Sequence, residues 1–212
     1  MRTHTAKCII LGHKNLSEND KFVFLYNEEL GKIKVVARGA RKLTSKFTGH
    51  LETLNICTAT LYFGPKNILL TEIATTENFR QVRENLDRLS SALQIAEITD
   101  KILYEHQTLD NLIKLIEKTI HHLSTTKKPL LIAIAYIIKL LDKTGVIPDF
   151  KEIQSEFNLE KKYRQFFEYL KTKPLSDIER IALTETEAIN IKNFVRQIIE
   201  NETDRTFKSF LI

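Results

Sequence analysis

The hydrophobic pattern of the 212-residue chain changes its period once, close to residues 77–80. Before this point, short runs alternate between apolar and polar residues, which is typical of half-buried β-strands. After it, apolar residues recur every three or four positions, as they do along the buried side of an α-helix. Strands followed by helices predict an α+β protein with two domains, which we place at residues 1–78 and 79–212.

The first domain is predicted to contain five short strands, at residues 5–11, 21–26, 32–37, 51–62 and 68–74. The connections between them are polar or contain glycine, and Gly31 stands where a turn needs a positive φ. Phe22 and Phe24, in the second strand, are interpreted as barrel core. The OB-fold is the common five-stranded barrel, and it binds oligonucleotides. We therefore interpret residues 1–78 as an OB-fold nucleic-acid-binding domain.

The second domain is predicted to be entirely helical. Its first long apolar stripe is followed by a helix whose N-cap is Thr108. Thr126 and Pro129 open a third helix that runs to about Lys143, and Gly145 stops it. Two or three short helical pieces should follow that third helix. The capping box Thr184–Glu187 then opens the last helix, because a threonine and a glutamate at this spacing satisfy two free backbone N–H groups.

Composition indicates a cytoplasmic protein with a basic first domain. The net charge is +5 and the pI is about 9.1, and residues 1–78 hold eleven Lys and Arg against seven Asp and Glu. Such a field speeds encounter with nucleic acid. Cys8 and Cys57 each lie inside an apolar run, so we expect buried, reduced thiols. The most apolar run, residues 130–138, is far shorter than the roughly 20 residues of a membrane span, and no signal peptide is recognised, so we expect no membrane contact.

Positive charge is concentrated in residues 31–49, GKIKVVARGARKLTSKFTG, and no acidic residue lies between Glu29 and Glu52. The first half alternates like a strand with a cationic outer face, and the second half is interpreted as a mobile loop because small polar residues and glycine interrupt it. Phe47 in this loop either stacks on a base or anchors the loop. A solvated strand face beside a polar loop is the alternative. The candidate nucleic-acid contacts are Lys32, Lys34, Arg38, Arg41, Lys42, Lys46 and Phe47.

No pattern in the chain indicates catalysis. Neither the phosphate loop GxxxxGK[ST] nor the GxGxxG motif is present, so nucleotide-driven work by this chain is not expected. His121 and His122 are adjacent and therefore face different sides of a helix, and no HExxH motif accompanies them. We predict a binding protein without catalytic residues, cofactor or metal.

Four segments have the order and spacing of a known family. They are IILGHKNLSENDKFVFLYNEELG, ELGKIKVVARGARKLTSKFTGHLETL, TENFRQVRENLDRLSSALQIAEITDKIL and the ending RTFKSFLI. Together they resemble the bacterial recombination-mediator family RecO, most clearly over residues 5–105. The basic ARGAR turn and the G-x-L strand that follows it carry the strongest part of the match.

The resemblance implies an N-terminal OB-fold followed by a helical domain. It implies binding of single- and double-stranded DNA, annealing of complementary strands and help in loading RecA during recombinational repair, in the cytoplasm at the nucleoid. The implied protein partners are RecR and the acidic tail of single-stranded DNA-binding protein. Carried over by position, DNA contact falls on Lys32, Lys34, Arg38, Arg41, Lys42 and Lys46.

Two positions depart from the family pattern. Many members have a four-cysteine zinc site after the motif that reads GVIPDF here, but Ile153 stands at the first cysteine position and no CxxC is present, so no zinc is expected. The family also often has arginine just before the aromatic residue Tyr136, where this chain has Ile134 and Ala135. The contact with the acidic tail is assigned to Tyr136, Lys139 and Leu140. Either Lys139, or Lys127 together with Lys128, is expected to substitute for the arginine.

Two other functions stay open at this point. In the first, the helical domain is an interaction scaffold and nucleic-acid contact is incidental. In the second, the OB-fold binds RNA, because a pattern of positive charge does not distinguish RNA from DNA. A hydrolase is the weakest alternative, since the strand-rich half has no cluster of acids that could hold a catalytic metal.

Overall fold

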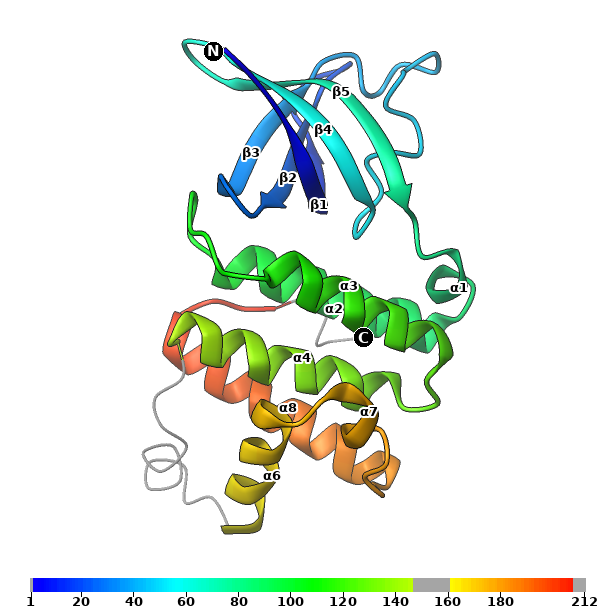
Figure 1. The fold of residues 1–212 in the computed structure, drawn as a ribbon, viewed down its shortest axis with the longest axis vertical. Coiled ribbons are helices and arrows are strands. Elements are labelled where there is room, and N and C mark those ends of the chain that lie inside the picture. The colour runs from blue at the N-terminus through cyan, green and yellow to red at the C-terminus, as the bar shows by residue number, and fades with distance from the viewer. Residues whose placement is uncertain (1, 147–160, 208–212) are drawn as a thin grey trace. The chain divides into compact units, whose positions relative to one another are not determined.

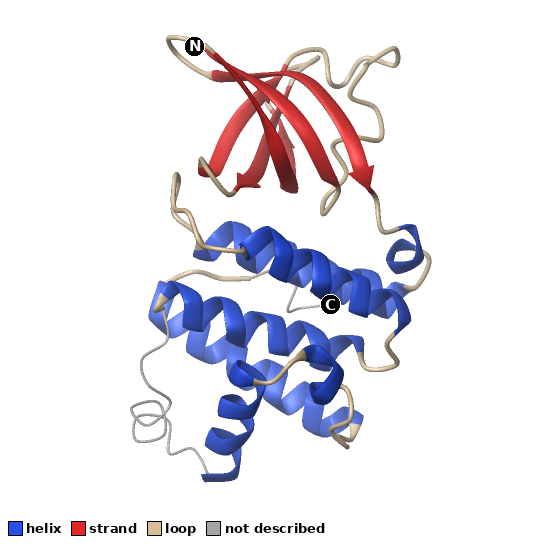
Figure 2. Ribbon diagram, in the orientation of Figure 1, coloured by secondary structure: helices blue, strands red, loops and turns tan. Residues whose placement is uncertain are grey.

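The computed structural model describes residues 2–146 and 161–207 (Figure 1). Within these ranges the strands come first and the helices follow, as the change of period predicts (Figure 1). Figure 2 distinguishes the strands from the helices by colour. Contacts divide the chain into two compact units. The barrel unit holds the residues up to Arg80 together with Leu103–Lys114, and the helical unit holds Gln81–Ile102 and the described residues from Leu115 onward.

Five strands form a closed barrel, which confirms the predicted fold class. They are β1 (Thr3–Asn15), β2 (Lys21–Asn27), β3 (Gly31–Ala37), β4 (Ile56–Phe63) and β5 (Ile68–Glu77). Their order around the barrel is β1-β2-β3-β5-β4, and β4 pairs back with β1. Only β3 and β5 run parallel; the other neighbours are antiparallel. A register shift between Ile10 and Gly12 marks an irregularity at which β1 can bend between its two partners.

Alternate residues of the strands fill the barrel. Val23 and Leu25 of β2 and Val35 of β3 are fully buried in this core. Phe47 and Leu51, from the connection between β3 and β4, complete it with 3% and 5% of their surface exposed. That connection is therefore fixed to the barrel by its own apolar side chains, each of which gains from leaving water.

The fourth strand begins later than predicted. The expected run 51–62 becomes a strand only at Ile56, because the chain turns first. Leu54 has a φ of 70°, and its N–H donates to a β1 carbonyl at 2.6 Å. The side-chain amide of Asn55 donates to two carbonyls of the preceding turn, at 2.9 and 3.2 Å. These bonds satisfy the backbone locally where the sequence pattern alone predicted a sheet ladder.

The chain returns to the barrel unit at Leu103–Lys114, which we call the returning segment. Tyr26 is fully buried, and its hydroxyl donates to the carbonyl of Leu109 at 2.9 Å and accepts from the N–H of the same residue at 2.7 Å. The predicted helix cap at Thr108 is wrong, because Thr108 lies in the non-helical part of this segment and the following helix starts only at Leu112. One tyrosine on β2 therefore fixes a segment far away in the sequence.

The returning segment also lies against the turn between β2 and β3. The N–H of His106 donates to the carbonyl of Lys32 at 2.8 Å. Gly31 has a φ of 70°, and a Cβ there would lie 2.5 Å from the carbonyl oxygen of Gln107. Both the positive φ and the close approach require glycine, so this position does more than the turn predicted from sequence.

The helical unit is built around α4 (Pro129–Thr144), which contacts α2, α6, α7 and α8. Every side chain from Leu131 to Ile138 is buried, as expected for a core helix. The remaining helices are α1 (Arg80–Arg83), α2 (Leu86–Ile102), α3 (Leu112–Thr125), α6 (Lys161–Thr172), α7 (Leu175–Ile178) and α8 (Glu185–Thr203). No helix in the described ranges is long and apolar enough to cross a membrane.

The structure confirms the predicted ends of α4 and the predicted start of α8, which are set by the backbone conformation and hydrogen bonding of a few neighbouring residues. Pro129 occupies the first turn of α4, and Gly145 ends it with a φ of 66° while its N–H donates to Asp142. The capping box is complete, since the Thr184 side chain accepts from the Glu187 N–H and the Glu187 carboxylate accepts from the Thr184 N–H. Such signals depend on neighbouring residues alone and can be recognised without the tertiary fold.

Both cysteines are buried and neither forms a disulfide. Cys8 and Cys57 lie opposite each other on β1 and β4, and the Cys57 thiol contacts the His50 carbonyl at 3.6 Å. Burial raises the pKa of both thiols, so both stay protonated. The predicted burial of the two thiols is confirmed.

Candidate nucleic-acid interface

The stretch 38–49, which we call the basic loop, is a series of tight turns. Backbone N–H groups of Lys42, Ser45 and Thr48 donate to the carbonyls three residues earlier, at 3.2, 3.0 and 3.2 Å. The Ser45 hydroxyl also accepts from the Phe47 N–H at 3.2 Å. The predicted mobile loop is therefore a hydrogen-bonded structure that holds its cations at set spacings.

The loop between β1 and β2 fastens the start of the basic loop. The Asp20 carboxylate accepts from the Gly39 N–H at 2.8 Å. Arg41 makes two bonds to the same loop, one from its N–H to the Asn19 carbonyl at 3.0 Å and one from its guanidinium to the Ser17 carbonyl at 2.7 Å. The acidic and polar SEND segment thus orients the basic turn without burying its charges.

Five of the six predicted cations are exposed, and one is not. Lys34, Arg38, Arg41, Lys42 and Lys46 are exposed on β3 and the basic loop. Lys32 is half-buried, and its ammonium donates to the Leu103 carbonyl of the returning segment at 3.0 Å. Because this group already holds the fold together, we withdraw Lys32 from the candidate contacts.

Phe47 anchors the basic loop. Its ring belongs to the barrel core and is 3% exposed, so it presents no open face on which a base could stack. The ammonium of Lys46 lies 5.5 Å from the centre of this ring, on the outer side of the core. Of the two interpretations of Phe47, the structure selects the anchor.

The outer face of β2 carries two aromatic rings that sequence reasoning had placed in the core. Phe22 and Phe24 are half-buried, and a lysine lies over each ring. The Lys34 ammonium is 5.2 Å from the Phe22 ring centre, and the Lys14 ammonium is 5.5 Å from that of Phe24. Lys14 was missed because it lies outside the basic stretch; its pairing with Phe22 across β1 and β2 is the signal that identifies it.

A hollow of about 450 Å³ lies beside the basic loop, and we call it the barrel hollow. His13, Lys21 and Glu52 contribute titratable groups, and Arg41 and Lys42 contribute two more charges. Partial burial lowers the pKa of His13, and the nearby Lys21 lowers it further, while Glu52 acts in the opposite direction. The imidazole is therefore mainly neutral at pH 7, and the net charge of the hollow is carried by its lysines and arginine.

The predicted peptide site on α4 is not on the surface. Tyr136 and Leu140 are fully buried, and the Tyr136 hydroxyl is 2.6 Å from that of Thr99 in the helical core. Lys139 is half-buried and donates to the carbonyls of Lys171 and Lys173 at 2.8 and 2.7 Å. These three residues stabilise the helical unit, so the assignment of a partner peptide to them is corrected.

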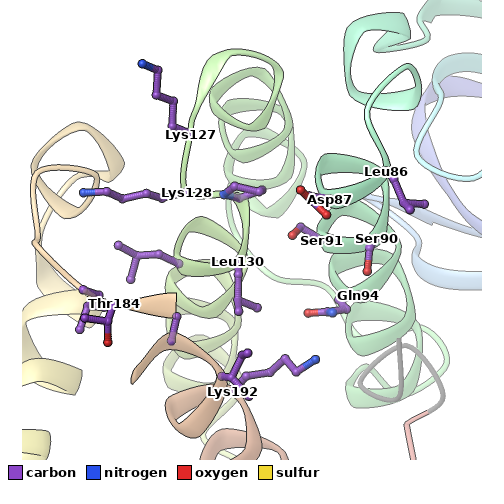
Figure 3. A pocket seen from close by; sticks show the side chains of 15 residues that line it. Leu86, Asp87, Ser90, Ser91, Gln94, Lys127, Lys128, Leu130, Thr184 and Lys192 are labelled. Atoms are coloured by element: carbon purple, nitrogen blue, oxygen red, sulfur yellow. The ribbon is translucent and has the colours of Figure 1, made fainter. Parts of the chain in front are cut away.

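The two substitute lysines lie at another hollow, of about 570 Å³, in the helical unit. Side chains from the start of α2, the start of α4 and α8 surround it (Figure 3). Lys127, Lys128 and Lys192 contribute three positive charges, and Asp87 contributes one negative charge. We call this feature the helical hollow.

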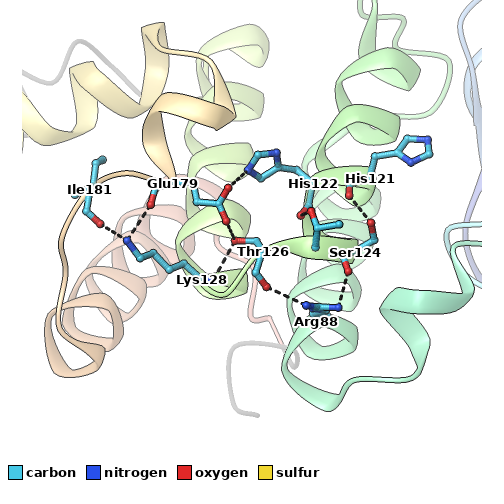
Figure 4. Close-up of polar contacts among 9 residues, drawn as sticks. Arg88, His121, His122, Ser124, Thr126, Lys128, Glu179 and Ile181 are labelled. Atoms are coloured by element: carbon cyan, nitrogen blue, oxygen red, sulfur yellow. Dashed lines mark hydrogen bonds and ion pairs between the residues drawn. The ribbon is translucent and has the colours of Figure 1, made fainter.

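A polar network fixes one side of the helical hollow (Figure 4). The Glu179 carboxylate accepts from the Thr126 hydroxyl at 2.5 Å and lies 2.9 Å from the His122 ring. The Lys128 ammonium donates to the carbonyls of Glu179 and Ile181, at 2.8 and 2.7 Å. The bond from Thr126 is the main reason that the pKa of Glu179 is lowered. Position 153, where the family's first zinc cysteine is absent, lies outside the described residues.

Comparisons with known families agree with this geometry. The model of the recombination protein O N-terminal domain matches residues 1–79, and the model of its C-terminal domain matches residues 83–153. The chain belongs to the recombination protein O (RecO) family. The two RecO matches meet where the chain passes from β5 into α1.

Several relatives carry the name DNA repair protein RecO. Those of Symbiobacterium thermophilum and Syntrophobacter fumaroxidans are each 30% identical to this chain, over 70% of its length. That of Roseiflexus sp. is 29% identical over 71% of the chain. The matched region covers 59%, 59% and 53% of these relatives, so the chain corresponds to little more than half of their length.

Proposed function

We propose that this chain acts in DNA repair as a non-enzymatic protein that binds DNA strands and anneals them. The name shared by its relatives, DNA repair protein RecO, supports the repair role. The observation that carries the proposal is a group of exposed cations, one on β3 and four along the adjoining basic loop. They are Lys34, Arg38, Arg41, Lys42 and Lys46. Cations held at set spacings on a five-stranded barrel suit a phosphate backbone.

The mechanism is electrostatic. Two complementary strands repel each other through their phosphates, and lysine and arginine side chains that neutralise both backbones lower that repulsion. Because Asp20 and the SEND loop hold the start of the basic loop, its cations lose less conformational freedom on binding. Phe22 and Phe24, each under a lysine, add apolar surface beside the charges on the outer barrel face.

The finer role is also a proposal. In it the chain assists the loading of RecA at the nucleoid, with RecR and single-stranded DNA-binding protein as partners. The acidic tail of the latter is assigned to the helical hollow instead of the buried residues of α4. Three lysines against one aspartate, beside apolar side chains such as Leu130, give this hollow the charge and surface that an acidic, apolar peptide needs.

A salt titration of binding to single-stranded DNA tests the proposal. If the five exposed cations each neutralise one phosphate, log K falls with log[salt] at a slope of about −3.5, taking roughly 0.7 per contact. Annealing of complementary oligonucleotides by the same protein should show the same sensitivity to salt. Competition with an RNA strand of matched sequence distinguishes the DNA proposal from an RNA-binding protein.

A charge reversal locates the contact. The double variant Arg38→Glu and Lys42→Glu should weaken binding by roughly tenfold or more and bring the slope to about −2, because two contacts are lost. The control is Lys66→Glu with Lys118→Glu, which changes the net charge equally at exposed positions away from the loop. Equal loss in both double variants would refute the assignment to the basic loop, and thermal unfolding checks that each variant is folded.

A further inference from the structure

The barrel hollow is lined by several charged side chains and a few apolar ones. The core side chains Phe47 and Leu51, which are 3% and 5% exposed, reach it only with narrow edges. Its volume, about 450 Å³, falls in the range of cavities that hold small organic ligands in proteins. Its lining is mainly polar, and its apolar part includes the side chain of Leu43 and narrow edges of Phe47 and Leu51.

The rim selects for negative charge. Lys21, Arg41 and Lys42 line the hollow with one opposing acid, Glu52. Arg41 is already oriented by the SEND loop, since its guanidinium donates to the Ser17 carbonyl. An occupant with a phosphate satisfies these cations, and one that also has a flat apolar face can cover the exposed side chain of Leu43 beside them.

Leu43 gives independent support for an occupant with an apolar face. Its side chain is fully exposed, at 103% of the reference surface, on the same basic loop, and it lines the same hollow. A leucine in this position gains nothing from the folded chain, because none of its apolar surface is removed from water. Contact with the face of a base would remove that surface from water between two phosphate-binding cations.

His13 supplies the remaining polar group. Its ring lines the hollow together with Lys21 and Glu52, and it is mainly neutral at pH 7 because burial and Lys21 lower its pKa. A neutral imidazole has one donor and one acceptor nitrogen, and the edges of all four bases offer both kinds of partner. Such a group tolerates every base and adds no charge of its own.

We propose that the barrel hollow is a nucleotide subsite, which takes one unstacked base of a DNA strand under Leu43 with the adjoining phosphate on Lys21 and Lys42. The proposal rests on the proposed function and deepens it. The basic loop supplies affinity along the strand, while the hollow interrupts base stacking at one position and sets the register of the strand on the barrel. Strand unstacking is a step that phosphate neutralisation alone does not provide.

The test uses the full chain and an oligo(dA) strand with 2-aminopurine at its centre, because this base fluoresces more strongly when it is unstacked. Binding of the wild-type chain should raise the fluorescence. The Leu43→Ser variant should lose most of that rise and bind about fivefold more weakly, as expected for part of a leucine surface, with an unchanged salt slope. Leu86→Ser is the matched control, since Leu86 is 78% exposed in the helical unit.

The possible results separate the subsite from the proposed function. If the wild-type chain binds with the expected salt slope but the fluorescence does not rise, or if Leu43→Ser equals wild type in both measurements, the subsite is refuted and phosphate binding stands. If the wild-type chain does not bind the strand at any salt concentration, both proposals fail. His13→Ala, with His121→Ala as its control, should reduce the fluorescence rise without changing the salt slope.

Discussion

Replacing Tyr26 with phenylalanine should destabilise the barrel unit by removing a single oxygen atom. The Tyr26 hydroxyl donates to the Leu109 carbonyl and accepts from the Leu109 N–H, at 2.9 and 2.7 Å, in a fully buried position. Burial raises the pKa of this phenol, so it remains a donor throughout the neutral range. The hydroxyl is therefore used in both of its hydrogen-bonding roles by one residue of the returning segment.

The magnitude follows from what each backbone group retains. The Leu109 carbonyl also accepts from the Leu112 N–H at 3.3 Å, so it keeps one partner. The Leu109 N–H loses the hydroxyl that accepts from it, and leaving such a group unsatisfied costs about 1–3 kcal/mol. The lost bond to the carbonyl adds about 0.5–1.5 kcal/mol, and the variant no longer has to bury a hydroxyl, which offsets part of the loss. We therefore expect the free energy of unfolding to fall by about 2 kcal/mol.

Urea unfolding followed by circular dichroism measures this loss, and hydrogen exchange at the Leu109 amide shows where it arises. Tyr62→Phe is the control, because Tyr62 lies on β4 of the same unit and its hydroxyl has no hydrogen-bond partner among the described residues. The control should change stability by less than about 0.5 kcal/mol. If Tyr26→Phe changes stability no more than the control, or if exchange at Leu109 is unaltered, the hydroxyl does not hold the returning segment.

Two further predictions concern the helical unit. Glu179→Gln should flatten the pH dependence of stability. The pKa of Glu179 is lowered in the folded protein, chiefly by the hydrogen bond from Thr126. The wild-type carboxylate therefore stabilises the fold above its unfolded pKa, and this effect is lost as the pH falls through its folded pKa. Urea unfolding at pH values from neutral to acidic checks this, and identical profiles for variant and wild type would contradict it. Lys127→Glu should weaken binding of an acidic, apolar peptide severalfold in a fluorescence titration, with Lys118→Glu as the control; equal affinities would remove the helical hollow as the peptide site.

Local rules predicted several features of the fold correctly, although the helix cap expected at Thr108 was wrong. The change of hydrophobic period separates strands from helices, Gly145 ends α4 by its positive φ, and the Thr184–Glu187 box starts α8. Each of these signals is contained in a few neighbouring residues, so no tertiary contact is needed to recognise it.

Errors arose where a tertiary contact decides the outcome. The Lys32 ammonium donates to the carbonyl of Leu103, which lies 71 positions away in the sequence. No pattern near Lys32 indicates that contact. Phe22 and Phe24 were assigned to the core because every residue of their strand from position 22 to 26 is apolar or aromatic, so alternation does not distinguish its faces. Tyr136 was open to correction from sequence alone, since the run around it is apolar on all sides of a helix and so predicts burial.

The structure agrees with the expected exposure of five candidate cations but not with the expected positions of the aromatic rings. Exposure of five cations follows from the cost of burying an unpaired charge, which applies in any fold. The role of an aromatic ring depends on which side of a strand or loop it occupies. Phe47 points into the core, where it cannot stack on a base, and Phe24 lies on the outer face instead of in the core. No sequence pattern indicates that Leu43 is fully exposed, because it is a single leucine next to charged and polar residues.

The returning segment also has a consequence for the order of events during synthesis. The last residue of β5, Glu77, leaves the ribosome before α2 does, and Leu109 follows Glu77 by 32 residues. At roughly 5–20 residues per second, the nascent barrel waits about 2 to 6 seconds with Tyr26 uncovered. The barrel unit is therefore complete only after α2 has been translated, and a substitution between residues 103 and 114 should appear as a defect of the barrel.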